Sequence, residues 1–189
     1  MQQTAHVTMP HTAGFAHPSR NVLHFNVEAG MRVADLGAGS GHYVWPIAEI
    51  VGEQGKVYAV DVQQDLLKRI HNEAQKRGLK NVAIVWSDLE KPNATRLADG
   101  TVDLALVSNL LFQLEDKRAV LREAKRILKK SGMLVLIDWA DSFNMMGPHK
   151  GHVVTKAAGM ELLQTEGFEF MREFHAGAHH WGLLGRPAA

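Results

Sequence analysis

The chain of 189 residues has a formal net charge of +1 and no cysteine, which excludes disulfides, thiolate metal sites and thiol nucleophiles. Its hydrophobic content of 46% and charged content of 22% are those of a globular protein, and its length suits one domain with a full core. The near-zero net charge gives no indication of nucleic acid or a membrane surface as a partner.

The first 20 residues are polar and rich in histidine, and no hydrophobic period runs through them. They lack the apolar segment of a signal peptide. No stretch of the chain approaches the ~18 apolar residues that a membrane span needs. We therefore expect a flexible arm over residues 1–20, a single domain over residues 21–189 and a cytoplasmic location.

Strands and helices alternate along the rest of the chain. Strands are predicted at Met31–Leu36, Lys56–Val60, Val82–Trp86, Val102–Val107, Met133–Ile137 and about residues 168–174 and 179–185. Helices are predicted at His42–Val51, Gln64–Arg77, Asp116–Lys129 and Thr155–Glu166. The link Ala176-Gly177-Ala178 is too short for a crossover, so the last two strands are antiparallel. The pattern predicts an α/β fold: a Rossmann-like, doubly wound sheet of seven strands, mostly parallel, with an antiparallel C-terminal strand.

A glycine-rich turn follows the first predicted strand. Residues 33–41 read Val-Ala-Asp-Leu-Gly-Ala-Gly-Ser-Gly, so Gly37, Gly39 and Gly41 follow Asp35 at every second position. Glycine adopts positive φ at little cost, and without a Cβ it lets the backbone approach a ligand closely. Because open sheets bind ligands beyond the carboxyl ends of their strands, this turn predicts a ligand site.

Two acids indicate which ligand the turn binds. Asp61 ends the second strand, where a carboxylate can accept both ribose hydroxyls, as in folds that bind NAD. Asp35 argues against NAD, because an anion beside the turn would repel the pyrophosphate of a dinucleotide. The third glycine is also one residue earlier than in G-x-G-x-x-G. A cationic ligand such as the ammonium group of S-adenosylmethionine (SAM) is favoured instead.

The third strand is followed by Ser87-Asp88-Leu89. An aspartate at this point could accept a hydrogen bond from the exocyclic amine of adenine. Val62 and Leu66 could enclose the adenine ring, although both would fit an ordinary core equally well.

These motifs together resemble those of class I SAM-dependent methyltransferases. The resemblance is carried by Val33–Gly41, Asp61, Ser87-Asp88 and the segment from Val102 through Asn109, and it extends over roughly residues 20–187. It is closest to the branch similar to ubiquinone/menaquinone C-methyltransferases and arsenite methyltransferases. The family fold has the strand order 3-2-1-4-5-7-6.

The resemblance implies a role for each motif. It places the methionine part of SAM along the first glycine turn, the ribose on Asp61, the adenine amine on Asp88, and Ser108-Asn109 near the sulfonium. The residues expected to bind SAM are Asp35, Gly37, Ala38, Gly39, Gly41, Asp61, Val62, Ser87, Asp88, Leu89, Ser108 and Asn109.

The expected function is methyl transfer (EC 2.1.1.-) to a small acceptor, with neither nucleic acid nor membrane as a partner. Candidates for a catalytic group are His17, Asn109, Asp138 and His149, and the sequence does not choose among them. No metal site is predicted, because chance clustering accounts for neighbouring histidines in a chain that has 11 of them. The lack of cysteine argues against arsenite as the acceptor, since that chemistry depends on thiolates in the family.

Two alternatives stay open at this stage. The chain could bind SAM without catalysis, as a sensor or a partner subunit, or it could be an oxidoreductase that uses NAD(P). The acceptor atom and the oligomeric state are not readable from the sequence.

Overall fold

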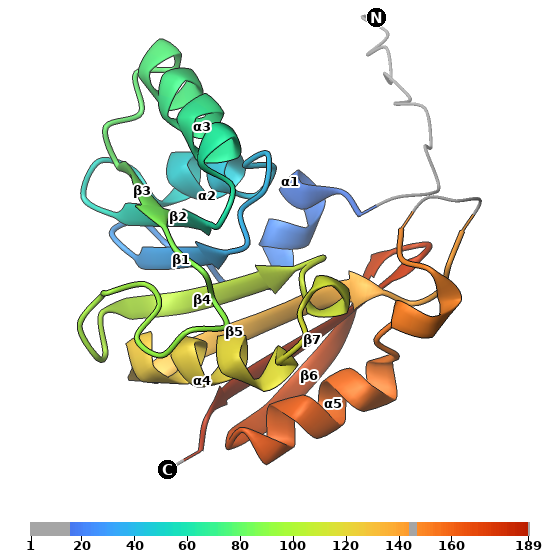
Figure 1. Cartoon of the computed structure of the whole chain (residues 1–189). Helices are drawn as coiled ribbons and strands as arrows, with labels where there is room; N and C mark the ends of the chain where they lie inside the picture. Colours follow the sequence, from blue (N-terminus) through green and yellow to red (C-terminus); the bar gives the residue numbers. More distant parts are fainter. Residues whose placement is uncertain (1–15, 144–146, 189) are drawn as a thin grey trace, which may run out of the picture.

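The computed structural model describes residues 16–143 and 147–188. They form one mixed sheet of seven strands in the order β3-β2-β1-β4-β5-β7-β6, with helices on both faces (Figure 1). The strands are β1 (Arg32–Leu36), β2 (Lys56–Asp61), β3 (Val82–Trp86), β4 (Val102–Ser108), β5 (Leu128–Trp139), β6 (Phe168–Gly177) and β7 (His180–Pro187). The α-helices are α1 (Pro18–Asn21), α2 (Val44–Val51), α3 (Gln64–Lys76), α4 (Lys117–Ile127) and α5 (Lys156–Thr165). Short 3-10 helices lie at η1 (Val22–His24), η2 (Leu111–Gln113) and η3 (Lys150–His152). The predicted fold class and strand order are confirmed.

The order of the strands reverses at β1, because the chain first builds the sheet outward from β1 to β3 and then continues on the other side of β1 with β4. β1 pairs in parallel with both β2 and β4, and the sheet continues in parallel to β3 on one side and β5 on the other. β7 runs antiparallel between β5 and β6. The carboxyl ends of β1 and β4 therefore lie side by side at the topological switch point, where folds of this type bind ligands.

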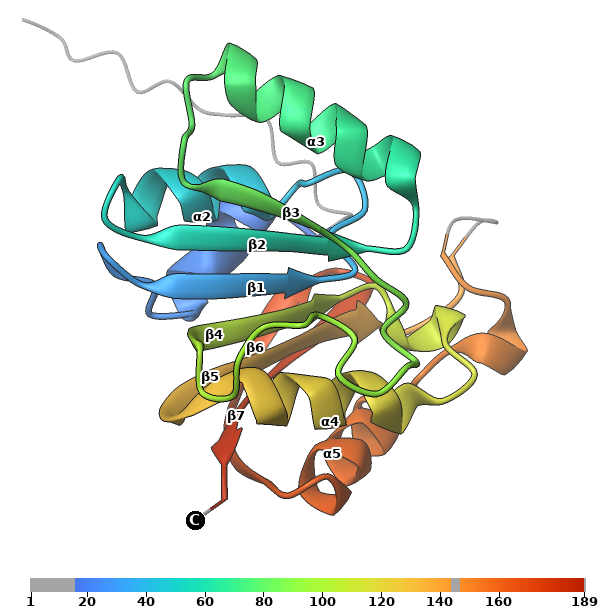
Figure 2. The same cartoon turned by 60° about the vertical axis from the view of Figure 1, so that its left-hand side comes forward.

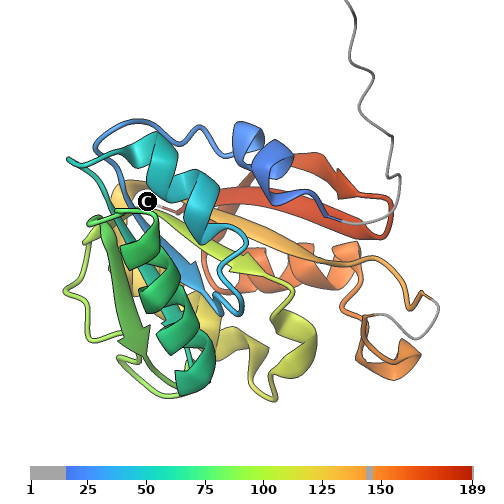
Figure 3. The same cartoon turned by 90° about the horizontal axis from the view of Figure 1, so that it is seen from above.

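The two faces of the sheet carry separate cores. One buried cluster joins η1, α2 and α3 to one face, and a second joins α4 and α5 to the other (Figure 2). Viewed from above, α1 and α2 lie along the same side of the sheet (Figure 3). Within residues 16–143 and 147–188, every helix is too short or too polar to cross a bilayer.

The helices begin where capping side chains occur in the sequence. The carboxylate of Asp116 accepts a hydrogen bond from the N–H of Arg118 at 3.0 Å, and Thr155 Oγ1 accepts one from Ala158 at 3.2 Å. In α4 the apolar side chains recur at helical spacing and are buried, namely Ala119, Val120, Leu121, Ala124 and Ile127. The predicted starts of both helices are confirmed to within one residue.

The predicted end of α4 at Lys129 was wrong, as was the predicted start of β5 at Met133. The helix ends at Ile127, and Leu128 has extended backbone angles (φ −72°, ψ 138°) and pairs with Val102 of β4. A Cβ on Gly132 would lie 2.8 Å from the Leu128 side chain, so the chain passes too close for a larger residue. Helix propensity and basic residues favoured a longer helix, but pairing with β4 overrides them.

The ends of the chain also differ from the sequence-based picture. The turn of the C-terminal hairpin is Ala178-His179, so Gly177 belongs to β6 and pairs with His180. Most of the predicted N-terminal arm lies outside the described residues, and its last residues begin α1. Val22 and Phe25, which follow α1, are buried in the core of the α1–α3 face.

Trp181 fixes α5 against the sheet. Its ring is 5% exposed and lies so close to Gly159 that a Cβ there would be 2.5 Å from a ring carbon. Its indole N–H donates to the carbonyl of Val154 at 2.9 Å. The substitution Trp181→Ala should therefore lower the free energy of unfolding by about 3–5 kcal/mol, measured by urea denaturation.

Trp86 provides the matched control, because it is 61% exposed. Trp86→Ala should change the free energy of unfolding by less than about 1 kcal/mol. Equal losses in the two variants would show that Trp181 does not anchor α5.

Candidate functional site

The glycine turn starts where β1 ends and curls over the end of β2. The N–H groups of Gly37 and Ala38 both donate to the carbonyl of Val60, at 2.8 and 2.9 Å. Gly37, Gly39 and Gly41 have φ values of +82°, +53° and +78°, which side chains with a Cβ rarely adopt. The turn is therefore built on the three glycines that the sequence singled out.

The three glycines differ in what surrounds them. A Cβ on Gly37 would lie 2.8 Å from Leu110, and one on Gly41 would lie 3.1 Å from both Ile70 and Trp45. A Cβ on Gly39 would meet nothing closer than a backbone oxygen at 4.0 Å. Gly37 and Gly41 thus serve packing as well as turn geometry, whereas Gly39 faces open space that a ligand could enter.

Asp61 holds the turn from the end of β2. One carboxylate oxygen accepts from the N–H of Gly39 at 2.8 Å, and the other accepts from the N–H of Gln63 at 2.8 Å. A carboxylate has about four lone-pair sites, so two remain for other donors. Asp61 can therefore brace the turn and still accept hydrogen bonds from a pair of hydroxyls.

Asp35 is buried beneath the turn and is 2% exposed. Burial, with a smaller contribution from the negative charge of Asp61, raises the pKa of Asp35 to about 7. Its carboxyl group is consequently poised between the neutral and the ionised form near neutral pH. A cation placed beside it would favour the ionised form.

A cavity of about 370 Å³ opens beside Asp35. Six of the residues predicted to bind SAM line it: Asp35, Gly37, Ala38, Gly39, Ser108 and Asn109. The sequence did not predict the other six lining residues, which are Ala16, Pro18, Ser40, His42, Tyr43 and Gln113. The cavity lies at the carboxyl ends of β1 and β4, where the strand order reverses.

A polar network ties α1 to the wall of this cavity. The side-chain amide of Asn21 donates to the hydroxyl of Tyr43 at 3.0 Å and to the carbonyl of Ala176 at 2.9 Å. Tyr43 shares a further hydrogen bond with Ser108, and burial raises the pKa of its phenol. No pattern in the sequence distinguishes these residues from ordinary packing, because they come from four separate segments.

Asn109 carries a polar atom without a partner. Its φ is +53°, and its side-chain oxygen is buried with no hydrogen-bond partner. Its backbone N–H donates to Ile137 at 2.9 Å, and its carbonyl accepts from the Gln113 amide at 2.7 Å. Buried oxygens are nearly always satisfied, and this one is left available to a donor on a bound ligand.

The segment after β3 lies outside the residues that line the cavity. The Ser87 hydroxyl donates to the carbonyl of Ala94 at 2.5 Å, Asp88 accepts from the N–H of Glu90 at 3.0 Å, and Leu89 is 5% exposed. Val62 is 57% exposed, so it is not a core residue. The predicted contacts of these residues with SAM stay predictions.

The other catalytic candidates are held in different places. Asp138 is fully buried, and its two oxygens accept from the N–H groups of Leu111 at 3.0 Å and Trp139 at 2.8 Å. Burial raises the pKa of Asp138 to about 6. Its carboxylate anchors η2 and does not line the cavity.

Neither histidine candidate lines the cavity itself. The carbonyl of His17 accepts hydrogen bonds from the N–H groups of Arg20 and Asn21 at the start of α1, both at 2.9 Å. The residues on either side of it, Ala16 and Pro18, line the cavity. His149 is exposed ahead of η3, with its ring 6.5 Å from that of His152. No three acidic or histidine side chains within the described ranges are placed to share a metal ion.

His180 is buried at the start of β7 without a partner for either ring nitrogen. Its ring lies 4.3 Å from that of Trp139. Burial, aided by the neighbouring His179 and opposed by Asp141, lowers the pKa of His180 to about 4. The folded protein therefore holds this imidazole in its neutral form.

This burial predicts a loss of stability in acid. The neutral form is favoured only in the folded state, so the contribution is present above the ordinary histidine pKa of about 6.5 and is lost as the pH falls towards about 4. His180→Leu should therefore gain stability relative to the wild type over that range, measured by urea denaturation at several pH values. A difference that does not change with pH would contradict this assignment.

The profile of the family described as "Methyltransferase domain" matches residues 27–177. The structure of a SAM-dependent methyltransferase from Aquifex aeolicus is similar, with a TM-score of 0.82 and 30% identity over 90% of this chain and 89% of that one.

Two curated relatives are similar over part of their length. An arsenite methyltransferase of Aquipseudomonas alcaligenes is 38% identical over 114 residues, which cover 58% of this chain and 33% of the relative. A demethylmenaquinone methyltransferase of Geobacillus kaustophilus is 31% identical over 115 residues, covering 60% and 47% respectively. This chain therefore spans only a third to about a half of these two relatives.

Proposed function

Because the chain belongs to the methyltransferase-domain family, we propose that it transfers a methyl group from SAM to a small acceptor. The observation that carries the proposal is the arrangement of two acids around an open glycine turn. Asp35 is buried at the cavity wall, Gly39 leaves room for a ligand, and Asp61 retains free acceptor sites beside both.

The residues present fit this cofactor in charge and in hydrogen-bonding capacity. SAM carries an ammonium group, and Asp35 can offer a carboxylate to it at the cavity wall. Its ribose has two hydroxyl donors, which suit the free lone pairs of Asp61. The unpartnered oxygen of Asn109 offers a further acceptor at the same cavity. A dinucleotide fits less well, because its pyrophosphate would lie near two carboxylates.

The chemistry that SAM supplies is an electrophilic methyl group on a sulfonium, which a nucleophile displaces in line. The task of the protein is to hold the two reactants in register and to exclude water, which can account for about 7–11 kcal/mol of the barrier. The glycine turn, Asp35 and Asp61 would position the cofactor. The carboxylate of Asp138 holds η2, whose Gln113 lines the cavity, so Asp138 would act as a positioning residue.

The acceptor in this proposal is a small molecule, as the near-neutral net charge supports. A protonated nucleophile would have to lose its proton, and His42 is a group at the cavity that could accept it. A cytoplasmic location is part of the same proposal.

The pKa of Asp35 predicts how SAM affinity depends on pH. Below about pH 7 the carboxyl group is protonated and no longer attracts the ammonium, so affinity should fall by up to about tenfold per pH unit towards pH 5.5. Asp35→Asn should bind SAM more weakly at pH 7.5 and lose most of this dependence. Calorimetric titrations with SAM between pH 5.5 and 7.5 would measure the affinity of both proteins. The same dependence of SAM affinity on pH in both would contradict the role of Asp35.

Asp61 gives a second prediction about the cofactor. Asp61→Ala should weaken SAM binding by about 2–4 kcal/mol, because the ribose donors lose a charged acceptor and the Gly39 N–H loses its partner. Asp65→Ala is the matched control, since that exposed carboxylate lies four residues along in α3. Equal SAM affinity in all three proteins would remove Asp61 from the site.

The proposed function is tested by binding and by transfer. Purified protein should bind SAM and S-adenosylhomocysteine with micromolar affinity and should not bind NAD. A screen of small acceptors with SAM labelled in its methyl group should then yield a labelled product. Binding without transfer to any acceptor would favour a non-catalytic SAM-binding protein, and binding of NAD alone would overturn the proposal.

A further inference from the structure

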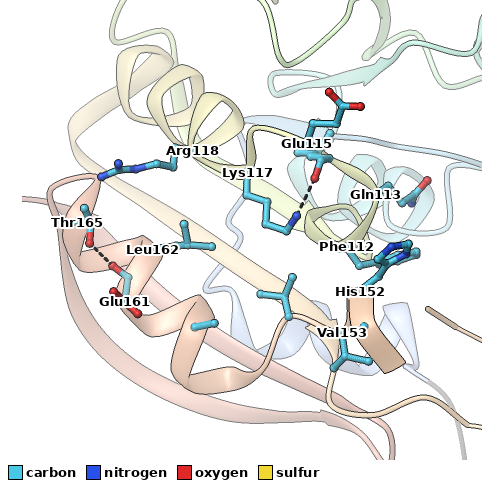
Figure 4. A pocket seen from close by; sticks show the side chains of 14 residues that line it. Phe112, Gln113, Glu115, Lys117, Arg118, His152, Val153, Glu161, Leu162 and Thr165 are labelled. Carbon is cyan, nitrogen blue, oxygen red and sulfur yellow. Dashed lines mark hydrogen bonds between the residues drawn. The ribbon is translucent and has the colours of Figure 1, made fainter. Parts of the chain in front are cut away.

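A second and larger cavity lies beside the cofactor cavity. It has a volume of about 970 Å³ and runs between the η2–α4 segment and the η3–α5 segment (Figure 4). We call it the η2–α5 groove. It is lined by Phe112, Gln113, Leu114, Glu115, Lys117, Arg118, Gly151, His152, Val153, Val154, Ala158, Glu161, Leu162 and Thr165.

The groove meets the cofactor cavity at Gln113, which lines both. Gln113 belongs to the short helix η2, which therefore forms part of the partition between the two spaces. This partition is firmly held, because Asp138 accepts from the N–H of Leu111 at 3.0 Å and Leu110 packs directly on Gly37. Because Gln113 lines both spaces, a molecule at the Gln113 end of the groove would lie next to the cofactor cavity.

The inner wall of the groove is apolar. Phe112, Leu114, Ala158 and Leu162 are partly buried against the core of the α4–α5 face. Val154 beside them is 5% exposed. Figure 4 shows Leu162 and Val153 between the two elements, with the side chain of Lys117 extending into the middle of the same space. Such a wall suits a ligand with an apolar body.

The charged groups of the groove offer little to an ionic ligand. The Arg118 guanidinium pairs with Glu166 at 2.5 Å, and Lys117 Nζ donates back to the carbonyl of Leu114 at 2.7 Å. Glu115 and Glu161 are exposed and would repel an anion. The two acids and two bases of the lining also balance each other.

We propose that the η2–α5 groove receives the methyl acceptor, and that the acceptor is a neutral, partly apolar small molecule. Its nucleophilic atom lies at the Gln113 end, where the groove meets the cofactor cavity, and its apolar body lies against Leu162 and Ala158. This inference rests on the proposed function, because the groove would be the acceptor site of the proposed methyl transfer.

The test uses two fluorescent probes that share a ring system and differ in charge. N-phenyl-1-naphthylamine is neutral, and 8-anilino-1-naphthalenesulfonate carries a sulfonate. The neutral probe should bind wild-type protein at one saturable site, about tenfold or more tightly than the sulfonated one. Ala158→Trp, which fills the groove from α5, should lower the affinity for the neutral probe by about tenfold or more. The affinity for SAM should change less than about twofold.

Matched variants keep the test decisive. Leu162→Trp, one helical turn after Ala158, should act in the same way and covers the case in which Ala158→Trp does not fold. Ser131→Trp is the control, because it fills another groove at the opposite ends of the strands, lined by Met133, Met171 and Arg186 among others. It should leave binding of the neutral probe unchanged.

The outcomes separate this inference from the proposed function. The acceptor site would be overturned if the neutral probe did not bind, or if it bound no better than the sulfonated one. It would also be overturned if Ser131→Trp weakened binding of the neutral probe and the groove variants did not. Failure of SAM to bind the wild-type protein would overturn the proposed function instead, and is read in a separate titration.

Discussion

The hydrogen bond between the Asp61 carboxylate and the N–H of Gly39 joins the two strand ends on which the site is built. β1 and β2 lie side by side in register, so the turn after β1 and the acid at the end of β2 meet at one edge of the sheet. The carbonyl of Val60 receives two further N–H groups from the turn. Because the turn is held in this way before any ligand arrives, its open face at Gly39 is already shaped for one.

The same arrangement explains why Asp35 has an unusual pKa. The turn buries this carboxyl group, and the neighbouring Asp61 adds a second negative charge. Two acids kept close together in a buried setting are costly, and a bound cation offsets that cost. The glycine turn, Tyr43 and Ser108 of the network that begins at Asn21, and Gln113 of η2 all line the space beside Asp35.

The sequence predicted the sheet and half of the cavity lining because both depend on local patterns. Hydrophobic runs gave the strands to within a few residues, and the alternation of glycine and acid located Asp35 and Asp61. The early start of β5 was missed because pairing with β4 decides where α4 ends. That pairing joins segments far apart in the sequence, so local propensities do not predict it. Tyr43, Asn21 and Gln113 were missed for a similar reason, since each matters through a contact with a distant segment. Asp138 illustrates the converse: a position after a strand made it a catalytic candidate, yet its carboxylate is occupied by backbone N–H groups.

The central claim is that the glycine turn and its two acids hold SAM. A crystal structure of the full chain with S-adenosylhomocysteine would test it most directly. The account predicts the amino-acid part of that ligand against Gly37–Gly39 with its ammonium facing Asp35, and both ribose hydroxyls on Asp61. A ligand bound elsewhere, or one whose ribose does not touch Asp61, would contradict it.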